Sequence, residues 1–248
     1  MSAPSSQPSD EREWRYDSAQ DLDLSLTNRL RAFPRQPDML VYGLRSLAAL
    51  TVRAYLGLYH RLRITGREHL PKERSYILVA NHTSHLDALC ILAALPLGSL
   101  HRAFPAAAQD YFFVSLPRHA AAAILVNAMP FARAGNARQS LELCHRLLAN
   151  AGNILIIFPE GTRSAEGLLG EFRAGVGCLV AGTDTPVLPC AIHGAFRAWP
   201  KGAAMPRPTA LRLTIGPPRT YGHLPDNRNS VHAIAKDLQG AVQELLTP

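Results

Sequence analysis

The 248-residue chain lacks a long apolar segment. Its two longest uncharged apolar runs, Ala88–Leu100 and Ala120–Ala132, are shorter than the roughly 18–20 residues that a membrane-spanning helix needs. The first 38 residues are polar and show no apolar core of a secretory signal peptide. We therefore predict a cytoplasmic protein that does not span a bilayer.

The sequence also lacks the cysteine spacing of metal sites and the motif of many serine hydrolases. Its four cysteines lie in apolar stretches without the spacing of a metal site, which predicts buried thiols in a reducing compartment. We expect no bound metal. The sequence has no Gly-x-Ser-x-Gly elbow, the turn that carries the nucleophile of many serine hydrolases.

Positive charge is in excess and unevenly distributed. The net charge is +7, but residues 1–38 hold five arginines against seven acidic residues, which leaves +9 on the remaining 210 residues. Such a basic body favours an anionic partner, for example a membrane surface, a phosphate ester or a coenzyme. Simple solubility is the alternative explanation. A nucleic-acid partner is not expected, because no recognisable motif or aromatic–basic platform is present.

The N-terminal quarter of the chain divides into two parts. Residues 1–38 contain few apolar residues and are predicted to form a disordered polar tail. Residues 39–63 are predicted to form an amphipathic membrane-docking helix, with apolar side chains in the acyl layer and Arg45 and Arg53 reaching headgroups. The alternative is a core helix whose arginines pair with carboxylates.

Residues 64–248 alternate between short apolar runs and helical patterns. The predicted strands are His101–Ala106, Met129–Arg133, Tyr76–Ala80, Asn153–Phe158, Pro186–Ile192 and Ala210–Ile215. The predicted helices are Ser84–Leu95, Ala108–Val114, Ala120–Asn127, Asn136–Ala149, Phe172–Ala181 and Ser230–Leu246. This alternation predicts a single α/β domain with a mostly parallel sheet flanked by helices. Such sheets bind ligands beyond the carboxyl ends of their strands.

One motif follows the strand Tyr76–Ala80 and places His82 five residues before Asp87. A neutral imidazole can take a proton from an alcohol near pH 7, and a carboxylate on its other nitrogen fixes the tautomer. The alternative is structural, because Ser84 and Asp87 form a Ser-x-x-Asp helix start. His85 is a second histidine in the motif, but it lacks a carboxylate at the same spacing.

A second motif, Phe-Pro-Glu-Gly-Thr-Arg-Ser, ends the apolar strand Asn153–Phe158. Gly161 permits a tight turn. Thr162 and backbone amides can donate to phosphate oxygens, and Arg163 can bind them through two hydrogen bonds. Glu160 only accepts hydrogen bonds when ionised, so it suits a hydroxyl group or a structural arginine. The alternative is a strand-to-loop turn with a surface arginine.

Together the two motifs resemble those of the glycerolipid acyltransferase family, of the lysophosphatidate acyltransferase type. Met129–Arg133 is similar to the second block of the family, which ends in a phosphate-binding arginine, although the glycine that usually precedes it is absent. Val187–Ile192 is similar to the fourth block, and Phe172–Gly175 fits the segment that usually follows the third. The resemblance covers about residues 40–220.

The resemblance implies an O-acyltransferase acting at a lipid surface. The co-substrate would be an acyl thioester, either acyl-CoA or an acylated acyl carrier protein, and no cofactor would be permanently bound. His82, oriented by Asp87, would deprotonate the hydroxyl of a lysophospholipid, most simply 1-acylglycerol-3-phosphate, to give a diacyl phospholipid such as phosphatidic acid. The implied substrate-binding residues are Arg133, Glu160, Gly161, Thr162 and Arg163. The protein would associate peripherally with anionic lipid on the inner face of the cell membrane.

Three alternatives stay open at this point. The acceptor could be another hydroxyl-bearing lipid, such as a lyso-ornithine lipid. The protein could be a thioesterase or lipase in which water replaces the lysolipid. It could also be a non-catalytic, peripheral binder of anionic lipid, although that function does not need His82 beside Asp87.

Overall fold

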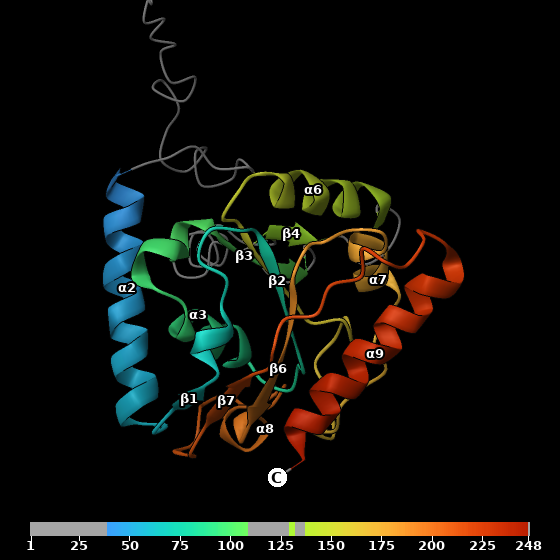
Figure 1. Cartoon of the computed structure of the whole chain (residues 1–248). Helices are drawn as coiled ribbons and strands as arrows, with labels where there is room; N and C mark the ends of the chain where they lie inside the picture. The colour runs from blue at the N-terminus through green and yellow to red at the C-terminus, as the bar shows by residue number, and fades with distance from the viewer. Residues whose placement is uncertain (1–38, 109–128, 132–136, 248) are drawn as a thin grey trace, which may run out of the picture.

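A seven-stranded sheet lies at the centre of the computed structural model, which describes residues 39–108, 129–131 and 137–247 (Figure 1). The order of the strands across the sheet is β1-β7-β6-β2-β5-β3-β4. Their bounds are β1 Arg63–Thr65, β2 Tyr76–Ala80, β3 Ala103–Ala108, β4 Met129–Phe131, β5 Ile154–Ile157, β6 Val187–His193 and β7 Arg212–Ile215.

The strands from β6 to β4 in this order are parallel to their neighbours, which confirms the predicted α/β class with a mostly parallel sheet. Strand β7 runs antiparallel to β6, and β1 pairs in parallel with β7. The sequence did not indicate this reversal. The connection from β6 to β7 contains only one short helix, α8 (Ala195–Ala198), so the chain returns beside β6 without crossing the sheet.

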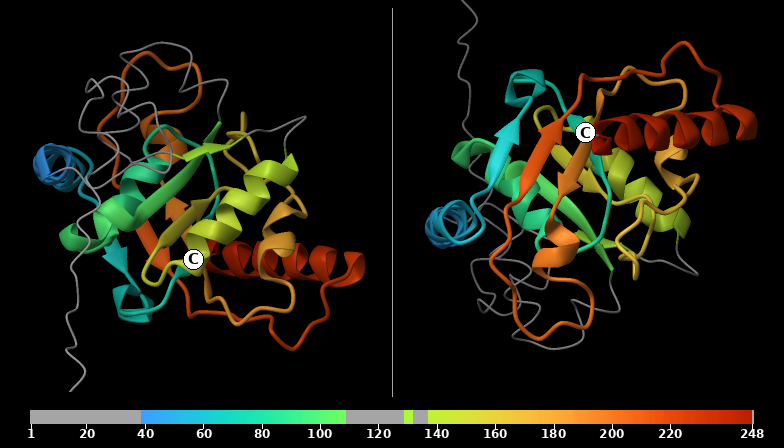
Figure 2. Two further views of the ribbon diagram at one scale, coloured as in Figure 1. Left: turned by 90° about the horizontal axis from the view of Figure 1, so that it is seen from above. Right: turned by 90° about the horizontal axis from the view of Figure 1, so that it is seen from below.

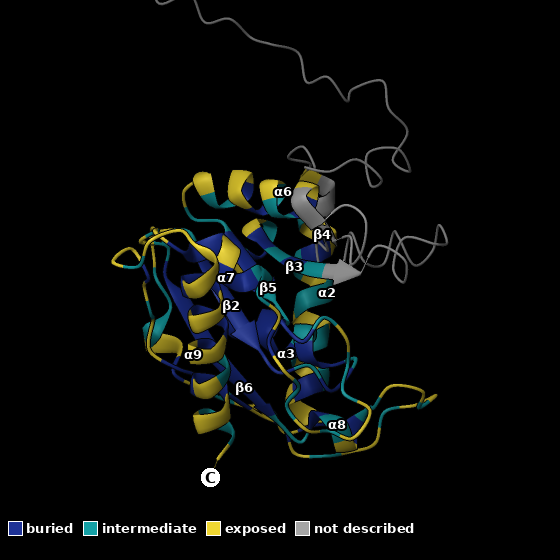
Figure 3. Ribbon diagram, turned by 90° about the vertical axis from the view of Figure 1, so that its right-hand side faces the viewer, coloured by how far each residue is buried: buried dark blue, intermediate teal, exposed yellow. Residues whose placement is uncertain are grey.

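Helices cover both faces of the sheet (Figure 2). One face packs against α2 (Met39–Leu58) and α3 (Asp87–Ala94), and the other against α6 (Ala137–Ala149), α7 (Gly175–Val180) and α9 (Arg228–Leu246). Short 3₁₀ turns, η1 (Arg67–His69) and η2 (Leu97–Arg102), complete this part of the chain. All five residues of β2 are buried, with alternate side chains in the two cores (Figure 3). The central strands are therefore apolar on both sides, as a parallel sheet requires.

Close packing at α7 and α9 depends on a glycine. A Cβ atom on Gly177 would lie 2.2 Å from the carbonyl oxygen of Val231, so any larger residue would push the helices apart. Helix α9 is capped by Asn227, whose side chain accepts a 2.9 Å hydrogen bond from the amide of Ser230. That cap satisfies one of the free amides of the first helical turn.

Helix α2 presents its two arginines to the protein, while Leu44, Leu47, Leu50 and Leu58 are exposed and Leu56 is buried in the core. Arg45 is only 4% exposed, and this burial lowers its pKa. Arg53 donates a hydrogen bond to the carbonyl oxygen of Leu95, just beyond α3. The prediction that both arginines reach outward toward headgroups is therefore wrong. Leu47, by contrast, is 63% exposed. The helix ends at Leu58, before the predicted limit of residue 63.

Other predictions differ in detail or fall outside the described residues. Helix α3 begins at Asp87, three residues after the predicted start, and α7 covers only the second part of its predicted range. Cys90, Cys144 and Cys190 are buried as predicted, but Cys178 on α7 is exposed. The tail 1–38, the helix predicted at 120–127 and most of the helix predicted at 108–114 lie outside the described residues, as does Arg133. Across those that are described, no helix is long and apolar enough to cross a membrane.

Candidate active site

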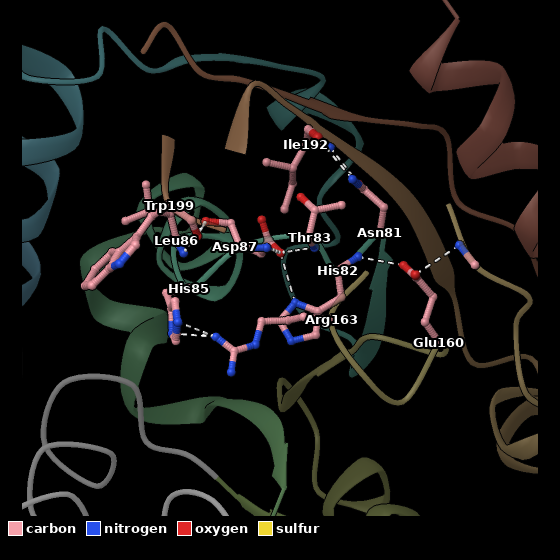
Figure 4. Close-up of polar contacts among 12 residues, drawn as sticks. Asn81, His82, Thr83, His85, Leu86, Asp87, Glu160, Arg163, Ile192 and Trp199 are labelled. Carbon is pink, nitrogen blue, oxygen red and sulfur yellow. Dashed lines mark hydrogen bonds and ion pairs between the residues drawn. The ribbon is translucent and has the colours of Figure 1, made fainter. Parts of the chain in front are cut away.

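The two sequence motifs meet at one edge of the sheet. Strands β2 and β5 are parallel neighbours, with Val79 paired to Ile157, so the loops that follow them start side by side. The side chain of Asn81 fixes the end of β2 to β6. It accepts a hydrogen bond of 2.8 Å from the amide of Ile192 and donates one of 3.1 Å to the carbonyl of the same residue. His82 therefore follows a strand end that is held in place by two hydrogen bonds (Figure 4).

His82 and Asp87 form a hydrogen-bonded pair. Nδ1 of His82 lies 2.9 Å from Oδ2 of Asp87, whose side chain is fully buried, while the His82 side chain is 22% exposed. The same oxygen accepts hydrogen bonds of 2.7 Å from the amides of Thr83 and Ser84. One carboxylate oxygen of Asp87 thus holds both the imidazole and the turn before α3, whereas the helix itself begins at Asp87 and not at Ser84.

This arrangement sets the tautomer of His82. An ionised carboxylate can only accept, so Nδ1 carries the proton and Nε2 keeps the lone pair. The ring of His82 is stacked on that of Phe158, with centroids 4.2 Å apart and planes 19° apart. Phe158 belongs to the second motif, so each motif contributes to the orientation of the imidazole.

The second motif also holds the backbone of His82 from both sides. Oε1 of Glu160 accepts a 2.7 Å hydrogen bond from the amide of His82. The carbonyl oxygen of His82 accepts a 2.8 Å hydrogen bond from the amide of Ser164. Oε2 of Glu160 accepts a 3.0 Å hydrogen bond from the amide of Gly170. Burial raises the pKa of Glu160, whereas these two backbone hydrogen bonds oppose the rise. Both oxygens of Glu160, predicted to bind substrate, thus engage backbone amides.

Gly161 makes the turn that brings this loop back. Its φ angle is +73°, and its amide donates a 3.0 Å hydrogen bond to the carbonyl of Phe158. A Cβ atom here would lie 2.8 Å from Nε of Arg173. A larger residue would therefore both strain the backbone at this positive φ angle and crowd the side chain of Arg173. Thr162 follows at the exposed tip of the turn.

Arg163 turns from this loop toward the first motif. Its Nη1 lies 2.6 Å from Nδ1 and 2.5 Å from Nε2 of His85. The His85 ring in turn lies against Trp199, with centroids 5.0 Å apart. Burial lowers the pKa of His85, and the nearby Arg163 and His82 lower it further, against a smaller opposing effect of Asp87. His85 is therefore the neutral acceptor of a hydrogen bond from the guanidinium.

Trp199 is a site residue that the sequence did not indicate. It follows α8, and its carbonyl oxygen accepts hydrogen bonds from Oγ of Ser84 at 2.7 Å and from the amide of His85 at 3.3 Å. No sequence signal links it to the first motif, because the two are more than a hundred residues apart in an irregular segment. For His85 a signal was available, since it lies within the motif itself.

The geometry places an imidazole and a guanidinium on the same edge of the sheet. Asp87 orients the imidazole of His82, and the guanidinium of Arg163 lies against His85. Among the residues with described positions, no group of three or more His, Cys, Asp or Glu side chains could hold a metal ion. The polar groups present suit proton transfer from a hydroxyl on a molecule that also carries a negative charge.

Comparisons with known proteins find curated relatives of this chain. A 1-acyl-sn-glycerol-3-phosphate acyltransferase of Limnanthes douglasii is 31% identical over 163 residues, 63% of this chain and 54% of that protein. The 1-acyl-sn-glycerol-3-phosphate acyltransferase alpha of Homo sapiens is 27% identical over 129 residues, 52% of this chain and 44% of that protein. The chain therefore spans about half the length of these curated relatives.

A solved structure has the same fold. The crystal structure of the 1-acyl-sn-glycerophosphate acyltransferase PlsC from Thermotoga maritima matches with a TM-score of 0.65 and 25% sequence identity, over 88% of this chain and 86% of that chain. A family model described as Acyltransferase matches residues 61–193, more than half of the chain, and this range includes both motifs. The chain belongs to the glycerolipid acyltransferase family.

Proposed function

We propose that this protein transfers an acyl chain from an acyl thioester, either acyl-CoA or an acylated acyl carrier protein, to the free hydroxyl of 1-acylglycerol-3-phosphate, giving phosphatidic acid. The observation that carries the proposal is the 2.9 Å pair of His82 and Asp87, placed beside the loop of Arg163. The names of the relatives, each an acyltransferase of 1-acylglycerol-3-phosphate, support this choice of acceptor.

The reaction needs one base and no covalent intermediate on the protein. Nε2 of His82 takes the proton of the acceptor hydroxyl while the hydroxyl oxygen attacks the carbonyl carbon of the thioester. The new C–O ester bond forms, the C–S bond breaks, and the imidazolium returns its proton to the leaving thiolate. Buried Asp87 stabilises the transient positive charge on the ring through its hydrogen bond to Nδ1.

Arg163 is the described residue best suited to bind the acceptor phosphate. A guanidinium binds phosphate oxygens through two parallel hydrogen bonds, which fixes both position and orientation. Arg133 would be a second phosphate ligand by family resemblance. Gly161 and Thr162 would shape the turn around the glycerol backbone.

Helix α2 would bring this site to its lipid substrate at the inner face of the cell membrane. The helix carries two charged residues, Arg45 and Arg53, and both face the protein. Its outer side is consequently apolar, which suits insertion into the interfacial layer of a bilayer. The basic body would add attraction to anionic lipid.

The test is acyl transfer by the purified protein in detergent or liposomes. Palmitoyl and oleoyl thioesters would be offered with a panel of lysolipids, including lysophosphatidate and a lyso-ornithine lipid. We expect diacyl product with lysophosphatidate, and a loss of about 10²–10⁴-fold in turnover for His82→Ala. The folded state of the variant would be checked by circular dichroism.

Three outcomes would contradict the proposal. Undiminished turnover by folded His82→Ala would remove the base from the mechanism. Thiol release without acylated product would make the protein a hydrolase. Efficient transfer to the ornithine lipid alone would change the acceptor while keeping the reaction.

A further inference from the structure

His85 contacts the guanidinium of Arg163 near the pair of His82 and Asp87, and no carboxylate contacts its ring among the described residues. Nη1 of Arg163 lies within 2.6 Å of both ring nitrogens of His85. Figure 4 shows the His85 ring between Trp199 and the guanidinium. The contact therefore joins three parts of the chain: the first motif, the second motif and the segment after α8.

We propose that His85, supported by Trp199, is a positioning residue that holds Arg163 in the orientation that binds the acceptor phosphate. This inference rests on the proposed function and adds a specificity determinant to it. His85 does not touch the reacting atoms. It acts through the guanidinium, and its effect belongs to the binding of phosphate-bearing acceptors.

The chemistry of the pair supports this role. A neutral imidazole has one nitrogen that accepts from a guanidinium, whereas an imidazolium has none and would repel it. A guanidinium carries five N–H donors and can contact an imidazole and a phosphate together. An unrestrained arginine side chain loses conformational freedom when it binds a ligand, so holding it in place beforehand strengthens binding.

Two further contacts fix His85 itself. Its amide donates to the carbonyl oxygen of Trp199 at 3.3 Å, and the neighbouring Ser84 donates to the same oxygen through Oγ at 2.7 Å. Nε1 of Trp199 donates a 2.9 Å hydrogen bond to the carbonyl of Ala203, which holds the indole. The backbone of His85 is thus held by Trp199, and both of its ring nitrogens lie next to Nη1 of Arg163.

The test uses two variants of the full chain. His85→Phe keeps a ring against Trp199 but removes the acceptor, while His85→Gln keeps an acceptor oxygen near the position of Nε2. For His85→Phe we expect the Michaelis constant for lysophosphatidate to rise about tenfold, with kcat and the Michaelis constant for the acyl donor within about twofold of wild type. His85→Gln should restore most of the loss. Transfer to monoacylglycerol, which lacks the phosphate, should not change.

A binding measurement separates this inference from the proposed function. Lysophosphatidate would be titrated calorimetrically into His82→Ala, which needs no turnover, and into the same protein carrying His85→Phe or His85→Gln. A tenfold weaker affinity with Phe and recovery with Gln would support the inference even if no acyl transfer were found. An unchanged affinity, no detectable binding to His82→Ala, or a fall in kcat alone would overturn it.

Discussion

At the scale of single residues, Glu160 is where the structure adds most to the sequence. Family resemblance assigns it to the substrate, yet its oxygens accept hydrogen bonds from the amides of His82 and Gly170. Its carboxylate is largely buried, so these hydrogen bonds are worth more than they would be in water. Glu160 thereby connects the loop that carries Arg163 to the backbone of the proposed base.

Replacing Glu160 with glutamine separates these two roles. Glutamine has one acceptor oxygen, and its NH₂ group would face a backbone N–H, so one of the two amides loses its partner. We expect kcat to fall about tenfold because His82 is displaced, with little change in the Michaelis constant for the acceptor. Steady-state kinetics measure both values, and exposed Glu166→Gln is the matched control. A raised Michaelis constant at constant kcat would instead show direct contact with the acceptor.

At the scale of elements, the end of α2 is joined to the start of β7 through a buried histidine. His60 is fully buried, with Nδ1 3.2 Å from the carbonyl oxygen of Thr209 and Nε2 3.0 Å from the hydroxyl of Tyr55. A neutral ring satisfies both contacts, donating through Nδ1 and accepting at Nε2. Burial lowers the pKa of His60, against a smaller opposing effect of the Thr209 hydrogen bond.

The lowered pKa of His60 predicts that acid destabilises the contact between the end of α2 and the segment before β7. Below about pH 6.5 the unfolded chain protonates at this position more readily than the folded one, so stability falls as the pH falls toward the folded pKa. The loss from one such group is at most about 1.4 kcal/mol per pH unit. Urea unfolding at pH 7.5 and 5.5 should show a smaller loss for His60→Gln than for wild type. His145→Gln, at an exposed position of α6, should keep the wild-type loss; equal losses in all three proteins would refute the prediction.

At the scale of the whole molecule, the sequence predicts the fold and the meeting of the two motifs. The apolar runs at β2 and β5 predict buried parallel strands. The motifs that follow these two strands then lie at the same edge of the sheet. The order of β7 and β1 could not be predicted, because β1 is three residues long with one apolar side chain, Ile64. Tertiary contacts such as His85 with Trp199 leave no local pattern in the sequence.

Which face of α2 packs on the core could not be predicted from the sequence either. Helical periodicity separates two faces of a helix but does not indicate which of them meets the core. The structure turns Arg45 and Arg53 inward, so the outer face is an uncharged stripe. Its exposed members are Met39, Leu44, Leu47, Leu50 and Leu58. Helix α2, which carries the stripe, packs on the opposite face of the sheet from α9 (Figure 2).

If this stripe docks the protein on its lipid substrate, one charge at its centre should weaken docking without damage to the site. Leu47 is 63% exposed, so Leu47→Glu leaves the core intact while it places a carboxylate against an anionic surface. We expect sedimentation with phosphatidylglycerol vesicles to fall about tenfold, and turnover of vesicle-borne lysophosphatidate to fall with it. Turnover of the same acceptor in detergent micelles should stay near wild type, because the micelle brings lipid to the site without a bilayer. Ala233→Glu adds the same charge on α9, at an exposed position on the opposite face, and should change neither. Equal losses in both variants would attribute vesicle binding to overall charge, and no loss in either would remove α2 from docking.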